Sequence, residues 1–440
     1  MSDPLPSLAP HVLLVFLLQV SLLLLVALAL GRLAVRLGLP ALVGELLTGV
    51  LLGPSLAGAL APGAFEWVLP ADADQLHLTD AVGQLGVLLL VGLTGAQLDL
   101  AMVRKRGSTG VRVSLCGLLL PLALGIGAGF VVPGLLIPDG TGRGVFALFL
   151  GVAMCVTAIP VIAKTLADMG LLHRDIGQLT LAAGTVDDAV GWFLLSVVSA
   201  AATTGVRAGA VSLSALYLVA FVVAAMFIGR PLVRWAMRLA GRAGDGGVRV
   251  TVAVVVILLG AAATHAMKIE PLFGAFVAGI LVGQVSGDDP TLWQHLSPLR
   301  TVVLSVLAPL FMATAGLRMD LTALADPKVL LTGIALLLVA VVGKFAGAYL
   351  GARTSRLSHW EGIALGAGMN ARGVVEVVVA TAGLRLGVLN IATYTVIVLI
   401  AVFTSLMGPP ILRHAMSRVE TTVAETEREL ALAGVARPAG

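Results

Sequence analysis

Two adjacent aspartates, Asp187 and Asp188, lie in an otherwise apolar stretch, residues 181–199, that is long enough to cross a bilayer. An ionised side chain at the centre of a bilayer costs roughly 3 to more than 10 kcal/mol, depending on how the cost is measured. Each carboxylate therefore needs a cationic partner, a proton or a bound cation. Because burial favours the protonated carboxyl group and a nearby cation favours the ionised one, a proton and a cation can compete for such a site.

Two cationic side chains, Lys344 and Arg372, also fall inside apolar segments. A buried lysine and a buried carboxylate are each costly alone and much less costly together. Glu376 follows Arg372 by one helical turn, which is the spacing of an ion pair on one helix face. Arg372 and Glu376 are therefore expected to pair, in a role that is at least as much structural as direct.

Two further segments contain residues that disfavour a continuous helix at membrane depth. One holds Thr157-Ala-Ile-Pro160, where the proline removes a backbone donor and restricts the preceding residue. The other, residues 366–373, has several glycines together with Asn370 and Arg372. Unwound backbone near the bilayer midplane presents carbonyls and helix ends that coordinate ions. The alternative is a kinked helix at the first segment and simple close packing at the second.

The composition predicts an all-α polytopic membrane protein, whose helices would position these residues. Hydrophobic residues are 58% of the 440 and charged residues only 12%, about half the charge of a soluble domain. Thirteen hydrophobic segments can cross or enter a bilayer core of about 30 Å. Their approximate centres are Leu22, Leu47, Leu89, Leu120, Cys155, Phe193, Phe221, Ile257, Phe276, Leu307, Leu338, Val377 and Val396.

The 28 Lys and Arg residues are distributed unevenly between the two sides of this arrangement. Most of them fall in the segments that join odd-numbered to even-numbered spans, and in the C-terminal tail. Because basic residues are enriched in cytoplasmic loops, the N-terminus is predicted outside and the C-terminus in the cytoplasm. The expected location is the cell membrane.

An internal repeat relates the two halves of the chain. The same glycine spacing occurs in the second and in the ninth segment, at Gly44, Gly49 and Gly53 and at Gly274, Gly279 and Gly283. The third segment then ends near Gly95 and the tenth near Gly316. Equivalent segments are seven apart, so the copies must be inverted relative to each other. Two inverted six-helix repeats joined by the seventh segment follow, an architecture typical of secondary transporters.

As a set, these motifs resemble the sodium/proton exchanger family of bacterial monovalent cation:proton antiporters, within the paired-aspartate subgroup of the cation:proton antiporter superfamily. The resemblance runs from about Leu39 to Pro410. The motifs that carry it are Leu39-Pro-Ala-Leu-Val-Gly-Glu-Leu-Leu-Thr-Gly-Val-Leu-Leu-Gly-Pro-Ser55, Thr157-Ala-Ile-Pro160, Asp187-Asp188, Gly274-Ala-Phe-Val-Ala-Gly279, Pro309-Leu-Phe, Gly343-Lys344 and Met369-Asn-Ala-Arg-Gly-Val-Val-Glu376.

The resemblance implies a homodimer whose protomers each divide into two moving parts. A scaffold would comprise about residues 11–100 and 248–320, and an ion-carrying core about 109–205 and 328–413. A linker helix would cover about 209–230. The whole membrane domain would span residues 1–415, followed by a short cytoplasmic tail, 416–440, without a nucleotide-binding domain.

The resemblance also implies roles for individual residues. Asp188 is similar to the essential carboxylate that binds the cation and the proton, and Lys344 is similar to the lysine that pairs with its neighbour, Asp187. Thr157 would add a hydroxyl or carbonyl oxygen, the donor type that a hard cation prefers. The resemblance also implies two broken helices that cross in the core, and Pro160, Asn370, Arg372 and Glu376 would belong to them.

Exchange of a monovalent cation, Na⁺ or K⁺, for protons by alternating access is the function that these residues predict. If Lys344 also loses and regains a proton while Asp187 changes partners, two protons would move per cation. No cofactor, nucleic acid or enzymatic step is expected. Two alternatives remain: a transporter of the same fold that carries an organic solute, and a membrane protein that uses the carboxylates for acid/base chemistry.

Overall fold

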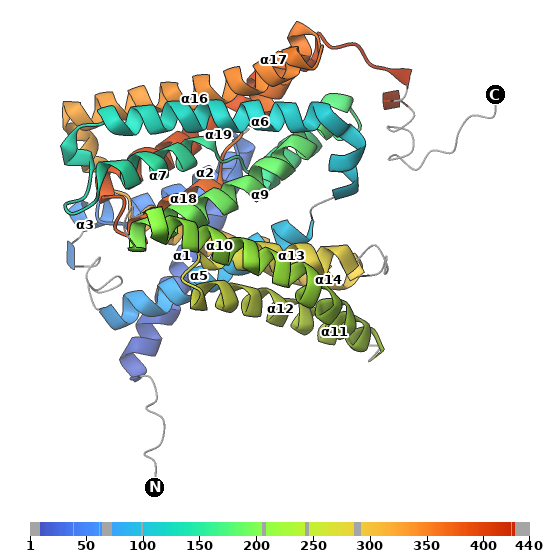
Figure 1. Ribbon diagram of the computed structural model, residues 1–440. Helices are drawn as coiled ribbons and strands as arrows, with labels where there is room; N and C mark the ends of the chain where they lie inside the picture. Colours follow the sequence, from blue (N-terminus) through green and yellow to red (C-terminus); the bar gives the residue numbers. More distant parts are fainter. Residues whose placement is uncertain are drawn as a thin grey trace.

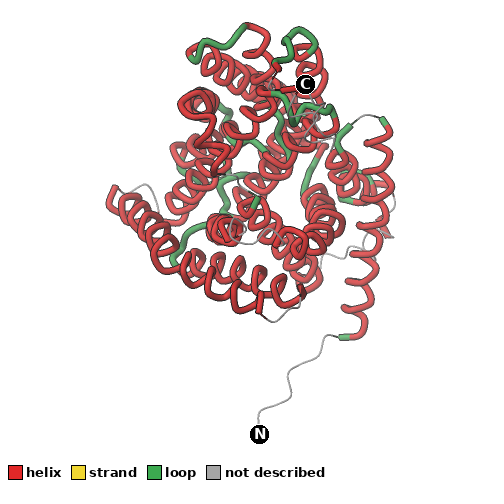
Figure 2. The backbone as a smooth tube through the Cα atoms, turned by 90° about the vertical axis from the view of Figure 1, so that its right-hand side faces the viewer, coloured by secondary structure: helices red, strands yellow, loops and turns green. Residues whose placement is uncertain are grey.

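The computed structural model describes residues 9–37, 39–60, 62–63, 73–97, 100–204, 208–242, 246–285, 292–423 and 425–426. Within these ranges the regular elements are all helices (Figure 2). Nine helices are long and apolar enough to span a membrane, one further span is a bent pair, and three apolar helices are shorter. Together they account for the thirteen expected segments, and the all-α polytopic class is confirmed.

The helices form two groups, and α9, which belongs to the second, lies where the two groups meet (Figure 1). In the first group α2 packs between α1 and α15, and α13 packs between α12 and α5. The bounds are α1 Pro10–Arg36, α2 Ala41–Leu52, α3 Ala57–Leu60, α5 Ala73–Ala96, α12 Gly246–Ala266, α13 Pro271–Val285, α14 Leu292–Val302 and, after the π-helical segment η3 Val303–Leu307, α15 Ala308–Leu317.

The second group is built around the antiparallel pair α6 and α16, which lie side by side along one edge in Figure 1. It contains α6 Leu100–Val131, η1 Gly134–Leu136, α7 Arg143–Cys155, α8 Ile159–Asp168, α9 Asp175–Thr204, η4 Leu321–Ala325, α16 Pro327–Thr354, α17 His359–Met369, α18 Val374–Arg385 and α19 Ile391–Met416. The groups are joined by α10 Ala208–Ala224, the π-helical η2 Ala225–Gly229 and α11 Arg230–Arg242.

The repeated glycines make equivalent contacts in the two halves. A Cβ atom on Gly49 of α2 would lie 2.0 Å from the carbonyl oxygen of Ala313 in α15. A Cβ atom on Gly279 of α13 would lie 1.9 Å from the carbonyl oxygen of Gly92 in α5. Only glycine allows backbones this close, which is how helices with small residues pack in membranes.

The reciprocal contacts obey the same symmetry. A Cβ atom on Gly316 would meet the Leu46 carbonyl oxygen at 2.2 Å, and one on Gly95 would meet the Phe276 carbonyl oxygen at 2.3 Å. Leu46 and Phe276 occupy the same place relative to the glycine spacing that first indicated the repeat. The sequence repeat is therefore also a repeat of helix contacts.

The two expected helix breaks lie where α7 gives way to α8 and where α17 gives way to α18. The axes of α17 and α18 differ by 46° across the second break. The breaks touch, because the backbone N–H of Ala158 donates to the carbonyl oxygen of Ala371 over 3.4 Å. The crossing of broken helices is thus present, with four helix ends near one point.

The boundaries differ from the expected ones mainly at the linker. The helix that begins as α10 continues through α11 to Arg242 instead of ending near residue 230. Its arginines stand four residues apart, so the helix can continue along the membrane surface. The division into scaffold and core stays a prediction, and most of the expected tail lies outside the described residues.

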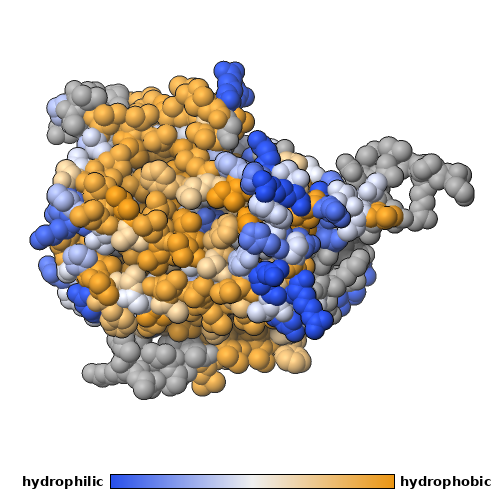
Figure 3. Space-filling view, turned by 90° about the horizontal axis from the view of Figure 1, so that it is seen from above, coloured by the Kyte–Doolittle hydropathy of each residue, from blue (hydrophilic) through white to orange (hydrophobic). Residues whose placement is uncertain are grey.

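The surface is apolar over a broad face, with hydrophilic residues gathered towards its edges (Figure 3). Exposed leucines line α1 and α16, among them Leu25 and Leu338. In water such a surface would be an aggregation hazard, whereas in lipid it is the expected exterior. Polar chemistry is confined to the interior between the helices.

Candidate functional site

Asp187 and Asp188 lie in the middle of α9, and both side chains are 0% exposed. The helix passes the point where the two breaks meet, since a Cβ atom on Gly191 would lie 3.1 Å from the side chain of Val156. The chain therefore carries two carboxyl groups to a place that also holds four helix ends.

Asp187 is held by three hydrogen-bond donors from three different elements. The Lys344 ammonium of α16 lies 2.5 Å from Asp187 Oδ2, and the Thr157 hydroxyl, in the first break, donates to the same oxygen over 2.9 Å. The Ser114 hydroxyl of α6 donates to Asp187 Oδ1 over 2.5 Å. Lys344 and Thr157, which were both candidates from the sequence, thus lie together at Asp187.

Lys344 has a second acceptor, the carbonyl oxygen of Cys155 at 2.7 Å. Cys155 is the last residue of α7, whose final carbonyls have no partner within the helix. The ammonium therefore compensates both a carboxylate and the negative end of a helix dipole. Both acceptors stabilise the ammonium group of a side chain that is 0% exposed.

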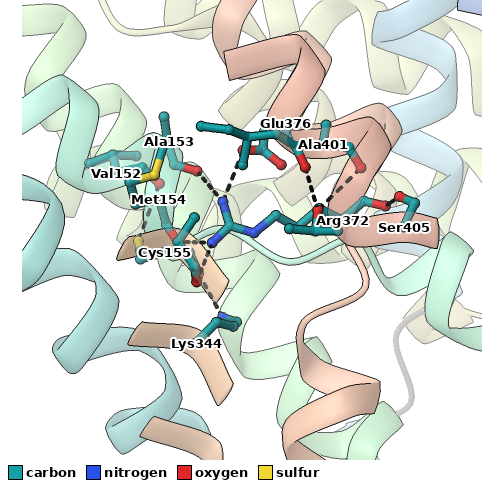
Figure 4. A network of polar contacts seen from close by, with 12 residues as sticks. Val152, Ala153, Met154, Cys155, Lys344, Arg372, Glu376, Ala401 and Ser405 are labelled. Carbon is teal, nitrogen blue, oxygen red and sulfur yellow. Dashed lines mark hydrogen bonds and ion pairs between the residues drawn. The ribbon is translucent and has the colours of Figure 1, made fainter. Parts of the chain in front are cut away.

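Arg372 likewise donates hydrogen bonds to the neighbouring backbone carbonyls at the end of α7. Its guanidinium donates to the carbonyl oxygens of Met154, at 2.5 Å, and Ala153, at 3.4 Å. It also forms an ion pair with Glu376 Oε1 at 2.9 Å, on the first turn of α18. Figure 4 shows Arg372 and Lys344 converging on the end of α7. The Ser405 hydroxyl of α19 donates to the backbone carbonyl of Arg372.

Asp188 differs from Asp187 in having neither carboxylate oxygen hydrogen-bonded within the described part of the chain. Its nearest charged neighbours are Asp187 and Lys344, and the backbone of Ile159 at the start of α8 is close. Three other buried oxygens lack a partner in the same part of the chain, Ser355 Oγ, Asn370 Oδ1 and Glu376 Oε2, and the last two lie at the break between α17 and α18. Unpaired buried oxygens suit a hard cation or a proton as the missing partner.

The remaining predicted residues occupy the breaks. Pro160 is the second residue of α8, a position where its missing N–H removes no helical bond. Asn370 directly follows α17, and its backbone N–H donates to Gly366. The Thr157 hydroxyl donates its proton to Asp187 in this structure, so its oxygen lone pairs and its backbone carbonyl remain available as acceptors.

Sequence reasoning missed two features. One is Ser114, a single hydroxyl in an apolar span, which carries no signal of its own because such serines usually bond to their own helix. The other is an ion pair between Arg385 and Glu270, which come from different helix groups. Ser199 of α9 contacts the same Glu270 carboxylate at 3.4 Å. Only the fold brings these residues together.

The site has no multidentate metal cage. No group of three or more His, Cys, Asp or Glu side chains that could hold a metal ion occurs among the residues with described positions.

Comparison with known proteins relates the whole chain to ion exchangers. A family profile described as "Sodium/hydrogen exchanger, transmembrane" matches residues 21–417. The chain is 31% identical to the Na(+)/H(+) antiporter NhaS4 of Synechocystis over 87% of its own length and 92% of that protein. It is 30% identical to cation/H(+) antiporter 18 of Arabidopsis thaliana, over 84% of its own length, and spans about half of that relative (45%).

A solved structure shares the fold. The sodium proton antiporter MjNhaP1 of Methanocaldococcus jannaschii at pH 8 superposes with a TM-score of 0.67, over 95% of this chain and 99% of that one. The sequences are only 13% identical. The likeness extends over all of the helix groups described above.

Proposed function

This chain belongs to the sodium/hydrogen exchanger family of membrane antiporters, and from that premise we propose that it exchanges a monovalent cation for protons at Asp188. The family is one of transporters and not of enzymes, so acid/base catalysis on a substrate is set aside. The observation that carries the proposal is the contrast between the two aspartates. Among the described residues Asp187 has three donors, whereas the equally buried Asp188 has the backbone of Ile159 nearby but no donor that meets hydrogen-bond geometry.

The competition at Asp188 follows from charge balance. A fully buried carboxylate without a donor is costly, so it must take up either a proton or a cation. Binding of one excludes the other, because each neutralises the same charge. When the site is exposed alternately on the two sides of the membrane, an inward proton gradient drives the cation outwards.

The movement that exposes the site would be a displacement of the core helices relative to the scaffold helices. In the predicted division the α9 helix and both breaks belong to the core, and they are tied to each other by Lys344, Arg372 and the contact of Ala158 with Ala371. Such internal ties favour motion as a unit, which is how transporters built from inverted repeats alternate access.

Na⁺ or K⁺ is the proposed cargo. Support comes from the oxygen-only character of the unpartnered groups, Asp188 and Asn370, which suits hard cations. The name of the relative NhaS4 points to Na⁺ for that protein. An organic anion is disfavoured as cargo, because it would meet two carboxylates at the site.

The proposal is tested by flux in proteoliposomes with an imposed pH gradient, comparing Na⁺, K⁺, Li⁺ and no added cation. The wild-type chain is expected to dissipate the gradient only with a transported cation. Asp188→Asn should abolish exchange, and Asp187→Asn should impair it. The matched control is Asp139→Asn, which removes an exposed carboxylate from the loop before α7. Robust exchange by Asp188→Asn would refute the assignment.

We propose the homodimer as the working unit in the membrane. The support is the family resemblance together with the large exposed apolar side chains of α1, which is only 22% buried within the protomer. Cross-linking of cysteines placed on α1, carried out in native membranes, should yield a dimer. A purely monomeric protein would contradict this part of the proposal without affecting the role of Asp188.

A further inference from the structure

Ser114 differs from most of the buried serines and threonines of this protein, because its hydroxyl donates to a side chain of another helix and not to its own helix. The threonines and serines within the helices mostly donate to a carbonyl oxygen of their own helix, four residues earlier. Thr180, Thr185 and Ser196 of α9 all do so, at 2.7–3.0 Å. This is the ordinary way to satisfy a hydroxyl group in an apolar helix. Ser114, which is 1% exposed, donates instead across the α6–α9 contact to the carboxylate of Asp187.

The packing of α6 against α16 explains why Ser114 can reach the site. A Cβ atom on Gly347 would lie 2.4 Å from the carbonyl oxygen of Cys116, and one on Gly351 would lie 2.6 Å from Cα of Val113. Glycines of α16 thus let the two backbones meet on either side of Ser114. The serine is held beside the helix that also carries Lys344.

The donors around Asp187 are divided between its two oxygens. Lys344 and Thr157 take Oδ2, and Ser114 takes Oδ1. A carboxylate that is hydrogen-bonded at both oxygens cannot rotate about its Cβ–Cγ bond towards Asp188. Hydrogen bonds to ionised groups are also the stronger ones, so three donors hold the Asp187 carboxylate firmly in one orientation.

We propose that Ser114 is a positioning residue for cation/proton exchange, which holds Asp187 in its ion pair with Lys344 and thereby leaves Asp188 free for the transported ion. This inference rests on the proposed function and adds a residue that acts through Asp187 and not on the cation. If the Ser114 donor is lost, Asp187 binds Lys344 less firmly. The other carboxylate next to Lys344 is that of Asp188. The ammonium then competes with the cation for Asp188.

The titratable and charged groups that surround Asp187 are Lys344 of α16, Asp188 of α9, and Cys155 at the end of α7. Arg372 lies beyond Cys155, on the adjoining carbonyls. A change of Ser114 alters none of these charges directly. Any shift in pH dependence must therefore come from the lost donor.

The test compares Ser114→Ala, Ser114→Thr and the control Ser196→Ala in proteoliposomes. In Ser114→Ala the pH at half-maximal exchange should rise by about one unit, the order expected for one hydrogen bond to a charged group. The KM for the cation should rise more than the maximal rate falls. Ser114→Thr keeps the hydroxyl and should restore the wild-type profile. Ser196→Ala removes a buried serine that bonds only to its own helix, and should leave the profile unchanged.

A second measurement does not depend on transport. The melting temperature of each purified full-length variant is followed against pH in detergent. Ser114→Ala should lose more stability at a pH where Asp187 is ionised than at acidic pH, and Ser196→Ala should show no such trend. Identical pH dependence of wild type and Ser114→Ala in both assays would overturn the inference. Absence of exchange by the wild-type chain would instead refute the proposed function, and the melting data would still decide the role of Ser114.

Discussion

Arg385, the last residue of α18, lies 2.7 Å from the carboxylate of Glu270, the residue directly before α13. The Glu270 side chain is 3% exposed and that of Arg385 is 42% exposed. The ion pair joins the helix group that carries the site to the group that packs against it. On the predicted orientation it lies on the outer side, next to Ser199 of α9.

Weakening this ion pair should open the outer side. In Glu270→Gln, a cysteine at position 199 is expected to react faster with a membrane-impermeant maleimide added outside, because Ser199 is buried beside Glu270. The background would be a chain with Cys116 and Cys155 replaced by alanine. The matched control is Glu361→Gln on α17, on the opposite side of the membrane. Equal labelling rates at position 199 with and without Glu270→Gln would contradict the idea that this ion pair closes the outer side.

Loss of the Arg372 guanidinium should destabilise the protein strongly. Arg372→Gln leaves Glu376 as a buried unpaired charge and removes donors from the end of α7, so a cost of about 3–5 kcal/mol is expected. The measurement is thermal unfolding in detergent. Arg413→Gln, an exposed arginine on the last turn of α19, serves as the control. A melting temperature unchanged by Arg372→Gln would show that the network in Figure 4 is not needed for stability.

The repeated glycines should be far less tolerant of change than glycines in open positions. Gly49→Ala and Gly279→Ala each place a methyl group about 2 Å from a backbone carbonyl of the neighbouring helix, so either helix must shift, at a cost of about 1–3 kcal/mol or more. Gly144→Ala meets nothing within 4 Å and should be neutral. Yield of folded protein and melting temperature are the measurements, and similar values for all three variants would contradict the packing described here.

The tail contributes a pH-dependent contact with the start of α9. Burial raises the pKa of Glu425, but hydrogen bonds from the backbone N–H groups of Thr422 and Asp175, together with the Arg174 charge, outweigh burial and hold the pKa below its usual 4.5. A carboxyl group with a lowered pKa adds stability above pH 4.5, and this stability is lost as the pH falls through the lower value.

Glu425→Gln should therefore lower the melting temperature at pH 7, by the equivalent of about 1 kcal/mol for charge-assisted hydrogen bonds at the protein surface. The difference from wild type should shrink as the pH falls below about 4.5. The control is Glu420→Gln. Glu420 lies nearby but contacts Arg174 through its backbone carbonyl, so this change removes a carboxylate without removing that contact. A constant difference across the pH range would mean that the contact is not electrostatic.

Much of the site could be predicted from the sequence because charges in a membrane are rare and costly. Asp187, Asp188, Lys344 and Arg372 stand out in apolar segments without any structural knowledge. Pro160 and Asn370 mark the breaks for the same kind of reason, since they interrupt helical patterns. The glycine spacing likewise indicated the repeat, because close helix packing leaves its trace at fixed intervals.

Other features depended on which surfaces of distant helices meet. Nothing in the span around Ser114 distinguishes it from Ser196, yet one donates to Asp187 and the other to its own helix. Glu270 and Arg385 are far apart in the chain and become partners only when α13 and α18 are packed. The sequence alone thus determined which costly groups must be neutralised within the membrane, because that cost is local to each span. Only the tertiary structure decided which aspartate is fully partnered and which stays free, because hydrogen-bond partners are assigned by contacts between helices.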